Sequence, residues 1–497
     1  MPILIRQEVI SLINLIKNEI IKITHKKAFY IILIIVTLFI ILNNVLYKVG
    51  SANNNDSYYG DYIEPPDKSK MAAKLALLDP NKASDIDEYI GYKTNLQIAE
   101  LSEKYPEKWQ SNVMAEQLFS VIYDLNYYTY KEVNSNKAIS LQTKVDDIIA
   151  KMDNNDWLYF LEQQKKVVDE QLTTFQRDIS SNLSESIEKD LANLKIAQTV
   201  IDYRVENKIN YDNSYLDKAI EEYKATSITL LNYADNISRS QEMEKQSIEE
   251  TQQRAKYMMD NQININLDGD EANANVHLLN SVTQVYTVLY IIIIVFLCCS
   301  IVSEEVNKGT IKQLLIKPYS RTKILLSKYI VCLLVILFAV LAVTLIQYIV
   351  GTITYGYTPF SEKVGLIYNY QLHELKLVSN FYYLFINLAM YLPIMLIIAT
   401  LSFTISTIFT NTVLAAIIPI ILIFIAELIN ALVIQYQIKF MRYFITLNWN
   451  ISDMAFGKTA QYPYINLSFS LIVCFSYIMG MVILAFLIFR RKNIKNI

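Results

Sequence analysis

Few residues in this sequence have the types and spacing that catalysis or metal binding requires. The three histidines are far apart, and no group of cysteines and histidines has the spacing of a zinc site. The four cysteines all lie in long apolar runs: Cys298, Cys299, Cys332 and Cys474. Gly457-Lys458-Thr459 matches the end of a phosphate-binding loop, but Ser452 stands where the loop needs its first glycine. The sequence therefore predicts no catalytic residue, metal ligand or cofactor in this chain.

Glu427 is the only ionisable residue deep within an apolar run. A charge at the middle of a bilayer costs about 2.5–3.5 kcal/mol, so we expect this carboxyl group to face a bundle interior or water. One interpretation is a hydrogen bond between helices, or a protonated carboxyl group in an outer vestibule. The other is a candidate residue of a translocation path.

The segment 303–328, between the second and third apolar runs, could carry a mechanical function. Gly309 can end the helix that leaves the second run, and Thr310 can cap a short second helix. The apolar face of that short helix would be formed by Ile311, Leu314 and Leu315. Pro318 stops it, and Ser320 can cap the helix that follows. This segment is either a plain surface hairpin or a rigid lever on which a cytosolic protein pushes.

Six apolar runs are long enough to cross a bilayer, which requires about 20 mainly apolar residues. They are residues 28–47, 282–302, 330–352, 381–406, 413–433 and 467–489. Helices of a soluble core rarely stay uncharged on every face over such lengths. The predicted fold class is therefore an all-α integral membrane protein with six transmembrane helices, five of them in a membrane domain at 281–497.

Basic residues are concentrated before the first run, between the second and third runs, and after the sixth. The excess of lysine and arginine in cytoplasmic loops predicts that both termini and the segment 303–328 are cytoplasmic. Residues 48–280 would then be extracellular. The predicted location is the cell membrane, and the first run is interpreted as an uncleaved anchor.

Residues 1–27 are predicted to form a cytoplasmic amphipathic helix at the membrane interface. Its basic residues would lie near anionic lipid headgroups and anchor the chain. The anchoring lysines are Lys17, Lys22, Lys26 and Lys27.

The segment 48–280 carries 25 basic and 40 acidic residues, a net charge of −15, whereas the rest of the chain carries +12. It contains no cysteine, and it has no glycine or proline from Glu107 to Asp268. Long helices are therefore expected, partly as a coiled coil, with one apolar stripe from Leu183 to Val205 and another from Leu216 to Tyr233. The acidity either keeps the domain soluble or attracts a cationic peptide or protein, and it argues against nucleic-acid binding.

The membrane part resembles the permease subunits of type-2 ATP-binding-cassette (ABC) transporters. The resemblance covers about residues 9–47 and 281–490, and the motif is Glu-x-x-x-Gly-Thr followed by Pro-x-x-Arg. It implies that 303–328 contains the coupling helix that docks on a separate ATPase. The residues that would carry this role are Glu304, Glu305, Gly309, Thr310, Leu314, Pro318 and Arg321. It also implies two ATPase copies that bind ATP and magnesium, and a second permease chain in a homo- or heterodimer.

The resemblance implies export of a peptide, a lipidic molecule or a drug-like molecule from a bacterial cell. The abundance of isoleucine, asparagine and lysine suggests a bacterium with an AT-rich genome. In such a bacterium the exporter could secrete an antimicrobial peptide or give the cell immunity to one. A second hypothesis is an ATP-driven mechanotransmitter or sensor, in which the extracellular domain acts on a surface partner. Sodium extrusion ranks lower, because it would require several carboxylates within the membrane.

Overall fold

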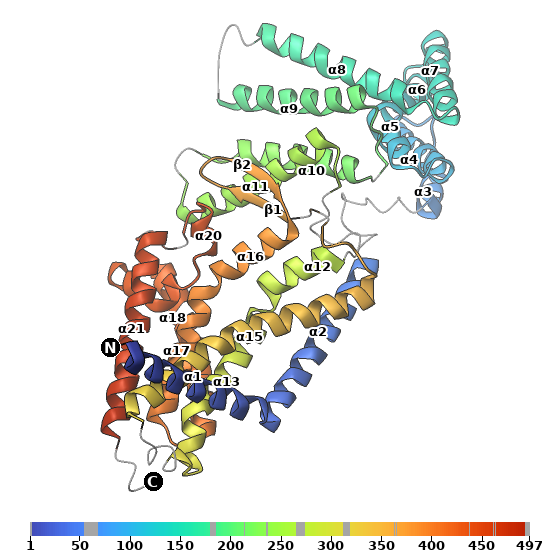
Figure 1. Cartoon of the computed structure of the whole chain (residues 1–497). Helices are drawn as coiled ribbons and strands as arrows, with labels where there is room; N and C mark the ends of the chain where they lie inside the picture. The colour runs from blue at the N-terminus through green and yellow to red at the C-terminus, as the bar shows by residue number, and fades with distance from the viewer. Residues whose placement is uncertain are drawn as a thin grey trace. The chain divides into compact units, whose positions relative to one another are not determined.

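The computed structural model describes most of the chain in two compact units. The described residues are 2–53, 68–178, 185–212, 214–234, 237–264, 274–311, 319–361, 363, 365–436, 438–460, 462 and 464–492. The membrane unit comprises the described residues of 1–56, 237–246 and 265–497, and the helical unit comprises those of 57–236 and 247–264. Figure 1 shows the elements of each unit.

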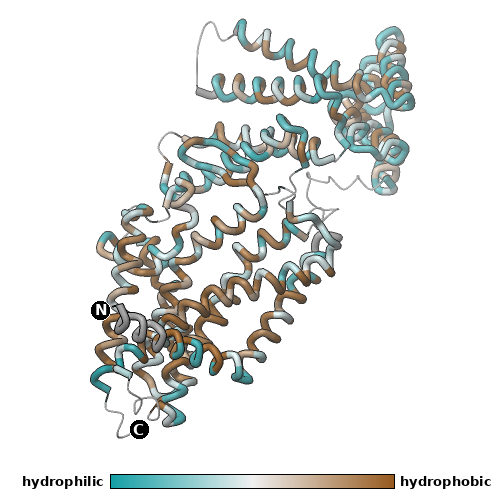
Figure 2. Tube along the Cα trace, in the orientation of Figure 1, coloured by the Kyte–Doolittle hydropathy of each residue, from teal (hydrophilic) through white to brown (hydrophobic). Residues whose placement is uncertain are grey.

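Five helices of the membrane unit are long and apolar enough to cross a membrane. They are α2 (Lys27–Asn53), α13 (Thr287–Asn307), α15 (Arg321–Tyr355), α18 (Thr412–Tyr436) and α21 (Leu467–Arg491). Helices α16 (Asn380–Met390) and α17 (Leu392–Ile408) meet at a 43° bend and make a sixth span if they act together. Figure 2 shows the apolar character of these helices. The fold class of an all-α membrane protein is confirmed at this level.

Helix α13 lies at the centre of the membrane unit. It packs against α15, α17 and α18, and most of its apolar side chains are buried, whereas most of α18 is exposed. Proline has no amide hydrogen, and Pro393 occupies the second position of α17, where that hydrogen would have no partner within the helix. The bend therefore lies directly before the proline that the sequence contains midway along its fourth apolar run.

Short elements connect the apolar helices. The turn between α17 and α18 is tight, and the Asn411 side chain accepts a hydrogen bond from the amide of Val413 at 2.8 Å. Strands β1 (Gly365–Asn369) and β2 (Glu374–Val378) form an antiparallel hairpin. The other short elements are α12 (Ala274–Asn280), the π-helix η3 (Ser281–Val285), the 3₁₀-helix η4 (Lys439–Tyr443), α19 (Ile445–Asn448) and α20 (Ser452–Ala455).

The helical unit consists of packed helices, as the absence of glycine and proline predicts. Its elements are α3 (Lys68–Leu75), α4 (Ile86–Lys104), α5 (Lys108–Val113), the π-helix η2 (Met114–Leu118), α6 (Phe119–Tyr130), α7 (Ser135–Asp153), α8 (Trp157–Asp178), α9 (Glu185–Asn207) and α10 (Tyr215–Leu231). Helix α11 (Arg239–Asn261) contributes residues to both units. The first predicted apolar stripe corresponds to α9, except for Leu183, which lies outside the described residues, and most of the second corresponds to α10. Helix α8 packs along α9 as a hairpin. The extracellular location of this unit stays a prediction.

A buried ionic cluster joins α5, α9 and α10 in the helical unit. Arg204 and Asp217 are fully buried and lie 2.6 Å apart, and Lys108 approaches Asp217 at 2.7 Å. Arg204 also pairs with Glu221 at 2.7 Å and stacks on the Tyr211 ring, with 3.9 Å between the guanidinium carbon and the ring centroid. Burial raises the pKa of Tyr211 to about 12. Because the described part of this unit contains no disulfide, such contacts must fix how its helices pack.

Replacement of Arg204 by methionine should destabilise the helical unit by about 3–5 kcal/mol, because Asp217 would stay buried without its strongest partner. Hydrogen–deuterium exchange of the full chain in detergent would measure this loss in α9 and α10. The matched control is Lys165→Met, which removes a half-exposed pair with Asp202 and should cost less than about 1 kcal/mol. Equal protection in the two variants would contradict a structural role for the buried cluster.

Candidate functional site

Four alternating charges form a closed ring at one end of the membrane unit. Helix α1 (Pro2–Thr24) supplies Glu19 and Lys22, α13 supplies Glu305, and α15 supplies Lys328. Lys22 contacts Glu19 at 2.8 Å and Glu305 at 2.6 Å. Lys328 contacts the same two carboxylates, each at 2.7 Å. Each charge of the ring therefore has two neighbours of opposite sign.

Three of the four charged side chains in this ring are buried. Lys328 is 0% exposed, Glu19 is 5% exposed and Glu305 is 9% exposed. The Lys328 ammonium group also donates a hydrogen bond to the carbonyl oxygen of Ile301 at 3.1 Å. A buried charge is tolerated when opposite charges and hydrogen bonds replace its hydration, and the ring meets this condition for Lys328. Helix α1 can therefore keep its position against α13 and α15 only while the charges of the ring remain paired.

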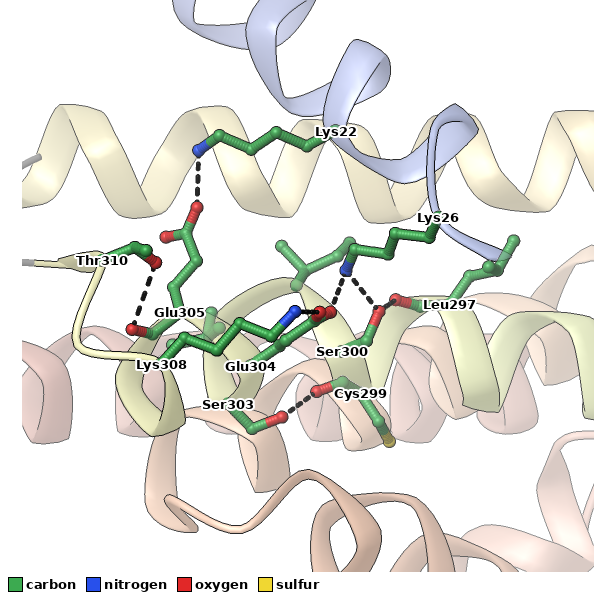
Figure 3. Close-up of polar contacts among 12 residues, drawn as sticks. Lys22, Lys26, Leu297, Cys299, Ser300, Ser303, Glu304, Glu305, Lys308 and Thr310 are labelled. Atoms are coloured by element: carbon green, nitrogen blue, oxygen red, sulfur yellow. Dashed lines mark hydrogen bonds and ion pairs between the residues drawn. The ribbon is translucent and has the colours of Figure 1, made fainter. Parts of the chain in front are cut away.

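A second group of charges extends this arrangement toward the surface. Glu304 pairs with Lys26, which follows α1, and with Lys308 at 2.6 Å. The Lys26 ammonium group also donates to the Ser300 hydroxyl at 3.2 Å. Figure 3 shows Lys22 and Lys26 extending toward Glu305 and Glu304, respectively. The two consecutive glutamates therefore bind two different basic residues of the N-terminal region.

The ring shifts the pKa values of its two members on α1, Glu19 and Lys22. Burial alone would raise the pKa of Glu19, but the charges of Lys328 and Lys22 hold that pKa below its ordinary value of 4.5. Burial opposes the charge of Lys22 as well, yet hydrogen bonds to Glu19 and Glu305 raise the pKa of this ammonium group. Both shifts favour the charged forms of Glu19 and Lys22 at neutral pH.

The structure confirms the predicted end of the helix at Gly309. Helix α13 ends at Asn307, and Gly309 has a φ of +69°, the left-handed conformation that favours glycine. The Thr310 hydroxyl donates to the carbonyl oxygen of Glu305 at 3.4 Å, back toward α13. The predicted short helix beyond it, with Leu314 and Pro318, lies outside the described residues.

Basic side chains close the C-terminal ends of two helices near the start of α15. Ser320 caps α15 as predicted, since its hydroxyl accepts from the amide of Lys323 at 3.3 Å. Arg321 donates to the carbonyl oxygens of Arg490 at 3.1 Å and Lys492 at 3.2 Å, at the end of α21. Lys492 in turn donates to the carbonyl oxygens of Thr407 and Ile408, at the end of α17 (2.9 and 3.2 Å). Cations at these positions satisfy orphan carbonyls and the negative end of the helix dipole.

The structure joins two groups of residues that the sequence assigned to different roles. Lys22 and Lys26 were predicted to contact lipid, but both form ion pairs with the glutamates of the predicted coupling segment. Lys17 and Lys27 are exposed, as lipid anchors require. Sequence reasoning did not identify Glu19. Its position could have revealed it, because an acidic residue on the apolar face of an otherwise basic helix needs a buried partner.

Glu427 lies apart from this site, on the exposed surface of α18. Its carboxylate accepts a hydrogen bond from the Asn430 amide at 3.3 Å, and Asn430 accepts one from the Thr446 hydroxyl. The described part of the chain therefore leaves Glu427 exposed, and whether it belongs to a translocation path stays a prediction.

The apolar helices define this protein as an all-α membrane protein, and the described residues contain no cluster of three or more potential metal ligands. It belongs to the family described as "Protein of unknown function (DUF2705)", which matches residues 247–495. It is also similar to "Uncharacterized protein YhcI" of Bacillus subtilis (strain 168), at 28% identity over 213 residues. That similarity covers 42% of this chain and 66% of the relative, so the chain spans slightly less than two thirds of the relative's length. No solved structure matches the chain.

Replacement of Lys328 by methionine should destabilise the membrane unit by about 3–5 kcal/mol, because Glu19 and Glu305 would both lose a buried partner. Thermal unfolding of the full chain in detergent would measure the effect, with Lys17→Met on exposed α1 surface as the control. The double variant Lys328→Met with Glu19→Gln should recover part of the loss, since one unpaired charge is then removed. An undisturbed melting temperature in Lys328→Met would contradict the ring.

The stability of the membrane unit should fall as the pH drops below about 4.5. Because folding lowers the pKa of Glu19, its contribution is complete above its ordinary value of 4.5 and disappears as the pH falls through the lower folded value. The difference in melting temperature between the native chain and Glu19→Gln, measured from pH 7 to pH 3, isolates this contribution from that of other carboxylates. The difference should shrink toward acid pH, and a constant difference would refute the assignment.

Proposed function

We propose that this chain is the membrane-spanning permease subunit of an ATP-driven ABC exporter. Its partner would be a separate cytosolic ATPase, present in two copies, which binds ATP and magnesium. The cargo would be a peptide, a lipidic molecule or a drug-like molecule. Export of an antimicrobial peptide, or immunity to one, would be a fitting biological role for such an exporter. Both termini would be cytoplasmic and the helical unit extracellular, in the cell membrane of a bacterium.

The ion-pair ring is the observation that best supports this proposal. The segment 303–328 contains the predicted coupling helix. Described residues on both sides of its centre form ion pairs or hydrogen bonds with other helices. On one side, Glu304 and Glu305 bind the N-terminal region through Lys26 and Lys22. On the other side, Arg321 binds the end of α21, and Lys328 closes the ring. Displacement of the segment would therefore move α1, α13, α15 and α21 together.

Ion pairing also changes the role that the proposal gives to Glu304. The resemblance implies that this residue contributes to docking of the ATPase. Its carboxylate contacts Lys26 and Lys308, so an intramolecular role is the simpler explanation of why a glutamate is needed there. In the proposed mechanism, Glu304 transmits movement to the N-terminal helix, and the centre of the segment, with Leu314, contacts the ATPase.

A charge exchange tests this mechanism. In liposomes that contain the chain and its co-purified ATPase, Glu304→Lys should lower cargo-stimulated ATP hydrolysis about tenfold, which is within the range of ordinary coupling energies. Adding Lys26→Glu should restore hydrolysis, because the pair is re-formed with its charges exchanged.

The controls separate transmission from docking. Leu314→Asp should abolish binding of the ATPase and leave the melting temperature unchanged, whereas Lys308→Gln should have little effect, since Lys308 is largely exposed. Failure of the exchanged pair to restore hydrolysis would contradict the intramolecular role of Glu304. If no ATPase co-purifies with the native chain, the proposed function is wrong.

A further inference from the structure

The last turn of α17 is bonded to both ends of the predicted coupling segment. At the beginning of the segment, the Ser406 hydroxyl oxygen accepts hydrogen bonds from the amides of Val302 at 3.1 Å and Ser303 at 3.2 Å. Ser303 and Ser406 are both fully buried. Because Val302 and Ser303 directly precede the two glutamates of the segment, the end of α17 is fixed to the place where the segment leaves α13.

Lys492 makes the connection at the other end of the segment. Its ammonium group donates to the carbonyl oxygens of Thr407 at 2.9 Å and Ile408 at 3.2 Å, in the last turn of α17. Its own carbonyl oxygen accepts a hydrogen bond from the Arg321 guanidinium group at 3.2 Å, at the start of α15. A single residue after α21 therefore links α17 to Arg321.

Membrane topology is the simpler explanation of a lysine at this position, because basic residues after a span help to keep that end in the cytoplasm. Arg490 and Arg491 are exposed and can already perform this task. Lys492 is instead half-buried, and burial lowers the pKa of its ammonium group. Carbonyl groups in the last turn of a helix have no partner within the helix, and a cation there also meets the negative end of the helix dipole. The side chain thus gives up part of its hydration to hold α17.

We propose that Lys492 is a positioning residue of the coupling mechanism, which holds the last turn of α17 between the two ends of the coupling segment. The charge ring connects the segment with α1, and Lys492 connects it with α17. Helix α17 packs along α13 and α21, so movement of the segment reaches the core of the membrane unit by a second route. This inference rests on the proposed function, and it identifies a residue outside the motif that carries the resemblance.

Hydrogen–deuterium exchange of the full chain with its co-purified ATPase in liposomes tests the proposal. A non-hydrolysable ATP analogue with magnesium should change the protection of amides at 405–412, and of those in α1, at least about fivefold, the lower end of ordinary coupling energies. Lys492→Met should remove the change at 405–412 and preserve the change in α1. Lys492→Arg should preserve both, since a guanidinium group can also donate to two carbonyl oxygens. The matched control is Arg491→Met, which removes the adjacent exposed charge and should preserve both changes.

The comparison with and without nucleotide separates positioning from simple stabilisation. If Lys492 only stabilised the structure, its replacement would lower protection at 405–412 equally in both states and preserve the nucleotide response, and this result would overturn the proposal. Loss of the response in Arg491→Met or in Lys492→Arg would overturn it as well. If α1 of the native chain responds to the analogue and 405–412 does not, the inference is wrong and the proposed function stands. If neither responds, the proposed function is wrong too.

Discussion

The membrane unit depends on the neutralisation of one fully buried lysine. Lys328 has no exposed surface, and its charge is balanced by Glu19 from the N-terminal helix and Glu305 from α13. A displacement of α1 by one turn would separate Glu19 from Lys328 and leave the buried ammonium group with one of its two carboxylate partners, at a depth where water cannot replace the other. Apolar contacts tolerate small shifts far better than such a pairing does. The ring therefore contributes more to the position of α1 than to net stability.

The same physical constraint operates in the helical unit. There Arg204 and Asp217 are both fully buried, and Lys108 and Glu221 balance them from the sides. In both units a charged pair fixes the register of helices whose apolar surfaces could pack in several ways. In the helical unit it does so without disulfides, and in the membrane unit it does so where α1 meets the apolar helices.

Much of the fold could be predicted from local patterns. The apolar runs became helices, because length and hydropathy are properties of continuous segments. Gly309 and Ser320 were correctly identified as helix boundaries, since capping depends on neighbours a few residues away. The charge ring was not predictable in this way. Lys22 and Glu305 are separated by 283 positions, and a single sequence contains no information about which distant charges meet.

Glu427 shows a different limit of sequence reasoning. Its cost within a membrane was evident from the sequence, but the side of the helix on which it lies depends on how α18 packs against α13 and α17. The structure leaves it exposed on α18, and its side chain bonds to Asn430 of the same helix. In the proposed exporter the ring would transmit displacement of the coupling segment into α13, and α18, which packs on this central helix, would feel that displacement through their contact.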